Sequence, residues 1–340
     1  MNEMRLVVPK VFTERLANSR LSLERLSATL NALGIIDDRH PLLTIYATGS
    51  LGRGEVGNHS DLDVFLVDTA DAGERIGNLA RIRLLSDLMR AADSAGFGEF
   101  SNDGEFLRVH PLADLRTYLG TRDDDATNVF TARMLLLLES EWLVGEEPYW
   151  TGVDGVLGDY WRDCKTPEGF LPYFLINDLV RYWKTLCLNY EANRADLSSP
   201  RDPEAVARRR LALVKLRFNR LWMCFNGLAY LVSGYQRLDD RTGCITRDHA
   251  RTMVALSPLD RLSRAVELVP DAYPSAQQAL YELGWWLAES DRPKGDLTSL
   301  IAEDAFYREA RARGEAFGNA MGDMLDAVAA PTILRRQLLL

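Results

Sequence analysis

Apolar residues at the start of the chain recur with the spacing of an amphipathic helix. Within residues 11–34, Leu16, Leu23 and Leu30 follow one another at two-turn spacing, which places them on one helical face. Gly34 ends the run, as a glycine beyond the last helical turn commonly does. The pattern therefore predicts an opening helix that buries one face.

Two short runs rich in β-branched and aromatic residues follow this helix, at 42–48 and 62–68. Their length and composition are typical of buried strands. A second amphipathic pattern spans 72–95 and ends at a glycine, which predicts another helix. Beyond it, an Asn-Asp-Gly turn signal inside 96–110 favours a hairpin. This part of the chain is expected to mix helices and strands.

Farther along, the pattern changes to long helical stretches, and an acidic run at 123–125 is expected to cap the first of them. Helices are expected at 127–145, 170–235, 250–290 and 298–328, with joints at 146–170, 196–203 and 291–297. The expected fold class is α+β. It consists of a small mixed-sheet module at 1–145 followed by an all-helical domain at 146–340.

The composition is that of an ordinary globular protein, with 47% apolar and 26% charged residues, so a full core can be buried. Because the net charge is −9, nucleic acid or a triphosphate would have to be bound by a local basic patch. No apolar run reaches the ~18 residues of a membrane span, and the N-terminus lacks a signal peptide's apolar segment. The widely spaced cysteines favour free thiols and a cytoplasmic protein.

The segment TIYATGSLGRGEVGNHSDLDVFLV at 44–67 carries the candidate chemistry. Its residues 52–57 formally match the GxGxxG pattern of dinucleotide-binding folds. That pattern requires a helix directly after the glycines and the next strand roughly 20 residues later. The next apolar run begins at Leu62, which leaves no room for such a helix. The segment also lacks the GK[ST] of a P-loop, so both interpretations are excluded.

Asp61 and Asp63 stand two positions apart at the entry of the second apolar run. Side chains at this spacing on a strand point to the same face, so the two carboxylates form a hard oxygen site suited to Mg²⁺ or Mn²⁺. Gly49 and Ser50 follow the first apolar run, where a glycine lets the backbone approach a phosphate and a hydroxyl donates to it. Arg53 adds positive charge. Together these residues favour metal-assisted nucleotidyl transfer from an NTP.

This arrangement of GS and DxD between two apolar runs resembles the signature of the DNA polymerase beta nucleotidyltransferase superfamily. The matching positions are Gly49, Ser50, Asp61 and Asp63. The segment is most similar to bacterial uridylyltransferases of nitrogen-regulatory proteins and their nucleotidyltransferase relatives. The features shared with them are carried by Arg53, Gly54, Glu55 and Ser60. The resemblance implies a metal-dependent enzyme that transfers NMP from an NTP, such as ATP, to a protein, RNA or small-molecule acceptor.

The resemblance also implies a third carboxylate on a later strand, and Glu105 is the candidate because it begins the next expected strand. Without it, the alternative is a member of this fold that has lost catalysis and binds nucleotide or RNA as a sensor or partner protein. Ser60 is expected to contact the nucleotide or to serve as a turn residue. Arg53 is expected to bind phosphate or to pair with Glu55. His110, alone near the end of a strand, is expected to be structural.

In the helical half, Asn177, Arg181 and Lys184 share one face of an otherwise apolar helix. Lys215 falls between apolar residues in the basic stretch 201–220. These basic residues are candidates for contacts to the triphosphate or to the backbone of an RNA. A solvated surface is the alternative.

Overall fold

The computed structural model describes residues 5–34, 40–72, 74–97, 100, 107–166, 169–196, 202–238 and 243–330. The chain divides into two compact units, one at Glu14–Arg162 and the other combining Met1–Thr13 with Asp163–Leu340. The first holds the segment 44–67 and is called the motif unit; the second is called the helical unit. The domain division expected after residue 145 stays a prediction.

Within the described residues, the motif unit contains a mixed four-stranded sheet in the order β3-β2-β1-β4. Strand β1 (Leu43–Thr48) pairs antiparallel with β2 (Asp63–Asp68) and with β4 (Glu141–Val144). Strand β2 also pairs parallel with β3 (Val109–Pro111). Both apolar runs predicted as strands are strands in the structure, and the α+β class is confirmed.

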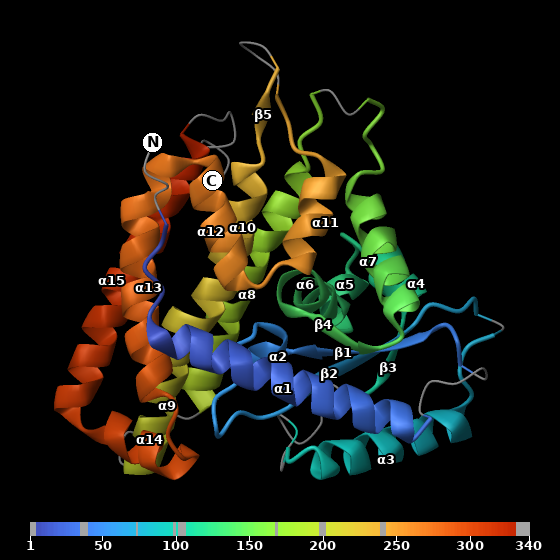
Figure 1. The fold of residues 1–340 in the computed structure, drawn as a ribbon, viewed down its shortest axis with the longest axis horizontal. Helices are drawn as coiled ribbons and strands as arrows, with labels where there is room; N and C mark the ends of the chain where they lie inside the picture. Colours follow the sequence, from blue (N-terminus) through green and yellow to red (C-terminus); the bar gives the residue numbers. More distant parts are fainter. Residues whose placement is uncertain are drawn as a thin grey trace. The chain divides into compact units, whose positions relative to one another are not determined.

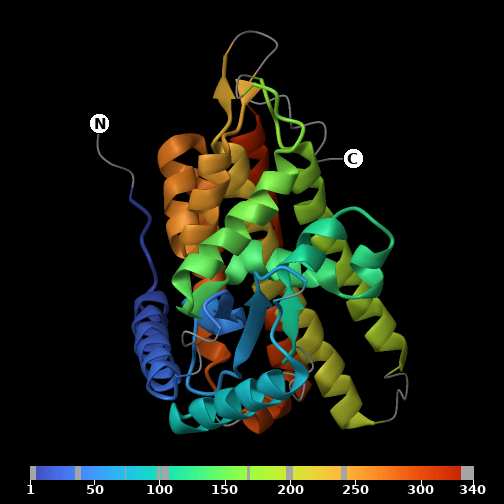
Figure 2. The same ribbon diagram turned by 90° about the vertical axis from the view of Figure 1, so that its right-hand side faces the viewer.

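One face of this sheet is covered by α1 (Lys10–Ala32) and α3 (Asn78–Ser94). In Figures 1 and 2 these two helices lie on the same side of the strands. Ile45 of β1 shares a fully buried core with Leu30 of α1 and Leu88 of α3. Both amphipathic patterns therefore form the predicted helices, although α3 begins later than its pattern suggests.

The opposite face of the sheet is aromatic. Tyr46 stacks on Phe65 with 5.8 Å between ring centroids and meets Tyr149 edge-on at 5.8 Å. His110 stacks on Phe65 at 5.5 Å. Because Tyr149 belongs to α7 (Glu146–Tyr160), this helix covers the aromatic face.

The stretch 127–145, predicted as one helix, ends earlier than expected. Helix α6 spans Val129–Glu139, and the residues after it form β4. Leu143 and Val144 become buried where β4 pairs with β1. The helical prediction for these last residues is wrong because strand pairing and burial outweigh local periodicity.

The stretch 146–170, predicted as a joint, holds the helix α7 in its first half. Its glycines suggest a loop, but Val153, Val156 and Tyr160 are buried at helical spacing. Glutamates in the first turn also favour a helix there, since they complement its dipole. The joint prediction is therefore wrong for this part.

The remaining helices of the motif unit, among the residues described, are short: α2 (Gly49–Gly52), α4 (Leu112–Thr117) and α5 (Asp123–Ala126). The acidic run forms α5 itself, and Asp124 is fully buried with its Oδ2 2.6 Å from Arg133 Nη2. Asp124 is therefore an ion-pair partner rather than the expected cap. The hairpin predicted at 96–110 falls mostly outside the described residues, and its described end forms β3.

The described part of the helical unit is built mainly from α8 (Tyr173–Asp196), α9 (Pro203–Lys215), α10 (Leu221–Ser233), α11 (Arg247–Ala255), α12 (Pro258–Leu268), α13 (Tyr273–Glu289), α14 (Lys294–Ala302) and α15 (Asp304–Ala329). It also holds a π-helical turn η2 (Leu216–Arg220), a 3-10 turn η3 (Pro270–Ala272) and a ribbon of β5 (Gln236–Arg237) and β6 (Gly243–Cys244).

Aromatic stacking forms the centre of the helical unit. Phe218, in the π-helical turn, stacks on Trp286 of α13 at 5.6 Å and on Phe317 of α15 at 5.4 Å. Helices α13 and α15 lie side by side (Figure 1). Throughout the part of the chain that the structure describes, each helix is too short or too polar to cross a lipid bilayer.

Candidate active site

The connection between β1 and β2 brings the glycine-serine turn next to the second aspartate. In the antiparallel pairing of these strands, Thr48 lies opposite Asp63, so Gly49 follows β1 beside that aspartate. Gly49 has a φ of 64°, a left-handed conformation that glycine adopts without strain. A Cβ atom built on Gly49 would overlap Asp63 Oδ2 and lie 3.2 Å from Asp63 Cγ. Any larger residue would therefore displace the Asp63 carboxylate.

The two aspartates of the motif flank a residue that points into the core. Leu62 is buried beneath α1 and α3, whereas Asp61 and Asp63 are half-buried. Because side chains of extended backbone alternate, both aspartates point away from that core. The structure thus gathers Gly49, Asp61 and Asp63 in one connection, with the half-buried Ser50 directly after the glycine.

Arg53 lies beneath this turn and is paired inside the protein. Its Nε is 2.7 Å from Glu55 Oε2, and its Nη1 pairs with Glu139 Oε2. Arg53 is 6% exposed, and both of its carboxylate partners are buried as well. Burial lowers the pKa of Arg53, but the two carboxylates raise it by more, so the net shift is upward. The sequence predicts that Arg53 either pairs with Glu55 or binds phosphate. The structure shows the pairing with Glu55, and phosphate binding by Arg53 stays a prediction.

Helix α1 anchors the loop that leads from the turn to the aspartates. Arg15 Nη1 donates to the Glu55 carbonyl oxygen at 2.9 Å, and the Val56 amide donates to Ser19 Oγ at 2.9 Å. Ser60 closes the turn before Asp61, since its Oγ accepts from the Gly57 amide at 3.0 Å. This is the turn role expected of Ser60, while its contact with a nucleotide stays a prediction.

The donor set for a metal consists of the Asp61 and Asp63 carboxylates. Glu105, the expected third carboxylate, lies outside the described residues, and among those described no three acidic, histidine or cysteine side chains gather as a metal site. Mg²⁺ keeps several waters and is commonly bound by one or two carboxylates together with phosphate oxygens. The half-buried aspartate pair therefore fits Mg²⁺ or Mn²⁺ in the presence of a triphosphate.

The basic candidates of the helical half lie on its own helices. Arg181 of α8 has its Nε 3.6 Å from Asp178 Oδ1. Lys184 of α8 and Lys215, the last residue of α9, are exposed. Since these residues belong to the helical unit, a shared role with the aspartates stays a prediction.

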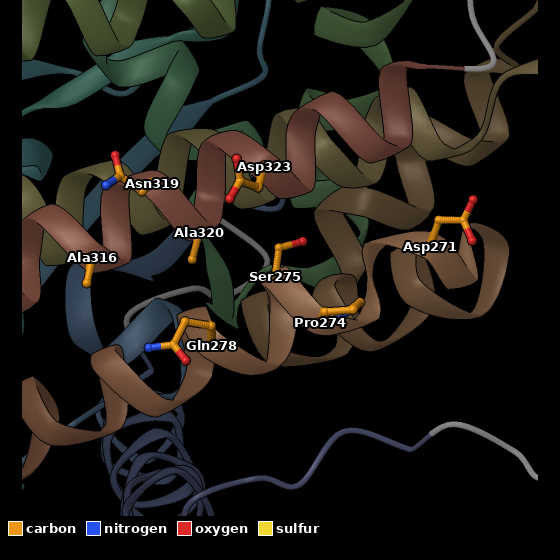
Figure 3. Close-up of a pocket in the computed structure, with 8 residues that line it drawn as sticks. All are labelled: Asp271, Pro274, Ser275, Gln278, Ala316, Asn319, Ala320 and Asp323. Carbon is orange, nitrogen blue, oxygen red and sulfur yellow. The ribbon is translucent and has the colours of Figure 1, made fainter.

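A groove of about 500 Å³ lies between η3, α13 and α15 of the helical unit (Figure 3). Its lining residues are Asp271, Pro274, Ser275, Gln278, Ala316, Asn319, Ala320 and Asp323. The charged members of this lining are acidic. A triphosphate needs cationic partners, so this groove does not suit one.

Glu139 contacts Arg53 beside the turn, and the sequence alone does not predict that it belongs to this site. It is 2% exposed and follows four leucines at the end of α6. A carboxylate directly after such an apolar run signals a buried charge, and a buried charge requires a partner. That signal indicates an ion pair, but it does not identify Arg53 as the partner.

No protein-family model matches this chain, and no curated protein matches it. Function is therefore inferred from the residues and the geometry of the turn.

Proposed function

We propose that this protein is a metal-dependent nucleotidyltransferase that transfers NMP from an NTP to an acceptor hydroxyl on a protein, an RNA or a small molecule. The observation that carries this proposal is the packing of Gly49 against the Asp63 carboxylate. It places the glycine-serine turn beside one carboxylate of the Asp61 and Asp63 pair within one strand connection. The small mixed sheet supports the proposal, since it is compatible with the resemblance seen in the sequence.

Four residues in and beside the connection have a role in the proposed reaction. Asp61 and Asp63 would hold Mg²⁺ or Mn²⁺, which when bound neutralises charge on the triphosphate and the leaving pyrophosphate. Gly49, without a side chain, lets the turn pack against the Asp63 carboxylate, and the Ser50 hydroxyl after it would donate to a phosphate oxygen. The acceptor oxygen bonds to the α-phosphorus, the bond to pyrophosphate breaks, and the hydroxyl proton is released to solvent.

The test is an assay with each of the labelled NTPs in the presence of Mg²⁺ or Mn²⁺, with and without added RNA. We expect pyrophosphate release and label transfer with at least one NTP. We also expect Asp61→Asn and Asp63→Asn to abolish both. Absence of release with any NTP, with no difference between wild type and these variants, would overturn the proposal. A rise in melting temperature with NTP but without turnover would favour the sensor alternative instead.

Gly49→Ala tests the contact with Asp63 more specifically. A left-handed alanine costs about 1–2 kcal/mol, and its Cβ would also push the carboxylate away. We expect a tenfold or larger loss of NMP transfer, roughly the effect of misplacing a reacting group. Gly34→Ala is the matched control, because Gly34 has a φ of 60° and, among the described residues beyond its chain neighbours, no atom lies within 4 Å of the place its new methyl group would take. It should lose similar stability while keeping full activity; equal activity losses would contradict the role of the contact.

A further inference from the structure

Glu139 contacts the glycine-serine turn with both its side chain and its main chain. Its Oε2 pairs with Arg53 Nη1, and its carbonyl oxygen would overlap a Cβ atom built on Gly52. The same Cβ atom would lie 2.8 Å from the Ala47 carbonyl oxygen. Gly52 therefore allows the end of α6 to press directly against the turn.

This contact connects Glu139 to the aspartate site through a short series of residues. The Arg53 amide donates to the Gly49 carbonyl oxygen at 3.0 Å, and Gly49 packs against the Asp63 carboxylate. Glu139 is the last residue of α6, and β4 begins two residues later beside β1. A helix and a strand thus hold Glu139 in place, which makes it a firm support for the turn.

Arg53 and Glu139 form an ion pair that is buried away from solvent. Taking an ion pair out of water costs about as much as the pairing returns, so buried pairs contribute little net stability and can instead select one conformation. Here the pair lies under the turn that packs on Asp63. We infer that Glu139, acting through Arg53, is a positioning residue that holds the Gly49–Gly52 turn against Asp63 for nucleotidyl transfer. This inference rests on the proposed function.

The experiment compares Glu139→Gln with Asp124→Asn in the full-length protein. Asp124 pairs with Arg133, which lies nearer the start of α6 than Glu139 does. The side chains of Asp124 and Arg133 are fully buried. Both variants remove one buried carboxylate charge, so both should lower the melting temperature. Only E139Q should lower kcat, by about 10–100-fold, and raise the Mn²⁺ concentration needed for half-maximal activity, as expected for a support of metal ligands. Glu139→Asp, which keeps the charge, should recover part of kcat.

Each outcome decides between the possibilities. If wild type turns over NTP and E139Q matches D124N in kcat and in Mn²⁺ dependence, Glu139 has only a structural role and the inference fails alone. If E139Q does not fold, the shorter Glu139→Asp is compared with D124N, and wild-type kcat in that variant overturns the inference. If wild type itself shows no turnover, the proposed function fails and the inference falls with it.

Discussion

Arg133 shows what a buried charge requires at the scale of one residue. Its guanidinium is fully buried and donates to both carboxylate oxygens of Asp124, to the Leu115 carbonyl at 3.0 Å and to the Tyr160 hydroxyl at 3.1 Å. Such a set of partners compensates the loss of hydration. Arg53 follows the same rule under the turn, with Glu55 and Glu139 as its partners.

His110 provides a pH test at the residue scale. Burial lowers its pKa to about 4, and the nearby Arg108 adds to the shift. Between pH 6.5 and 4, His110 therefore binds a proton in the unfolded chain but stays neutral in the folded chain. The free energy of unfolding should therefore fall as the pH drops from about 6.5 to 4, by up to ~3 kcal/mol from this residue.

The check on His110 is a comparison with His110→Phe, which keeps a ring beside Phe65 but does not titrate. Urea unfolding at pH 7, 5.5 and 4.5 would give the free energy of both proteins. The variant should lose a smaller part of its stability on acidification. Identical slopes for the two proteins would show that His110 does not contribute.

At the scale of elements, a tertiary contact sets the end of one helix, and a local hydrogen bond stabilises the start of another. Helix α6 gives way to β4 because β1 offers a strand partner. Helix α11, by contrast, begins with a local N-terminal cap, in which Thr246 Oγ1 accepts from the His249 amide at 3.1 Å. A side chain in this position satisfies an amide that has no partner within the helix.

Thr246→Ala should lower the free energy of unfolding by about 1 kcal/mol, because it leaves that amide without its cap. Thr252→Ala, in the same helix, is the control. The exposed Thr252 hydroxyl donates to the Asp248 carbonyl one turn earlier, so its loss should change stability by less than about 0.5 kcal/mol. Urea denaturation followed by circular dichroism measures both. A cap variant as stable as the control would contradict the capping role.

At the scale of the whole molecule, the chain forms two compact units, and the motif unit has a core of its own. Its sheet and the helices α1 and α3 enclose a continuous set of fully buried residues that includes Ile45 and Leu66. A unit with its own core is able to fold alone. The proposed catalytic residues Gly49, Asp61 and Asp63 all lie within it.

A fragment of residues 14–162 should therefore unfold cooperatively on heating, as followed by far-UV circular dichroism. The matched control is the same fragment with Leu66→Glu, which places a carboxylate at a fully buried position of β2. The control should show no cooperative transition. A gradual, non-cooperative melt of the unaltered fragment would contradict independent folding.

Local order along the chain was sufficient to predict α1, β1, β2 and α3, because periodicity reports which face of an element is buried. It also predicted Gly49, Ser50, Asp61 and Asp63 as candidate site residues, since they lie within one short segment. Only the tertiary structure decided that the residues after α6 form a strand, because β1, their partner, lies far away in sequence. It also decided that Glu139 pairs with Arg53, since a buried charge signals only that a partner exists, and the path of the chain selects which residue meets it.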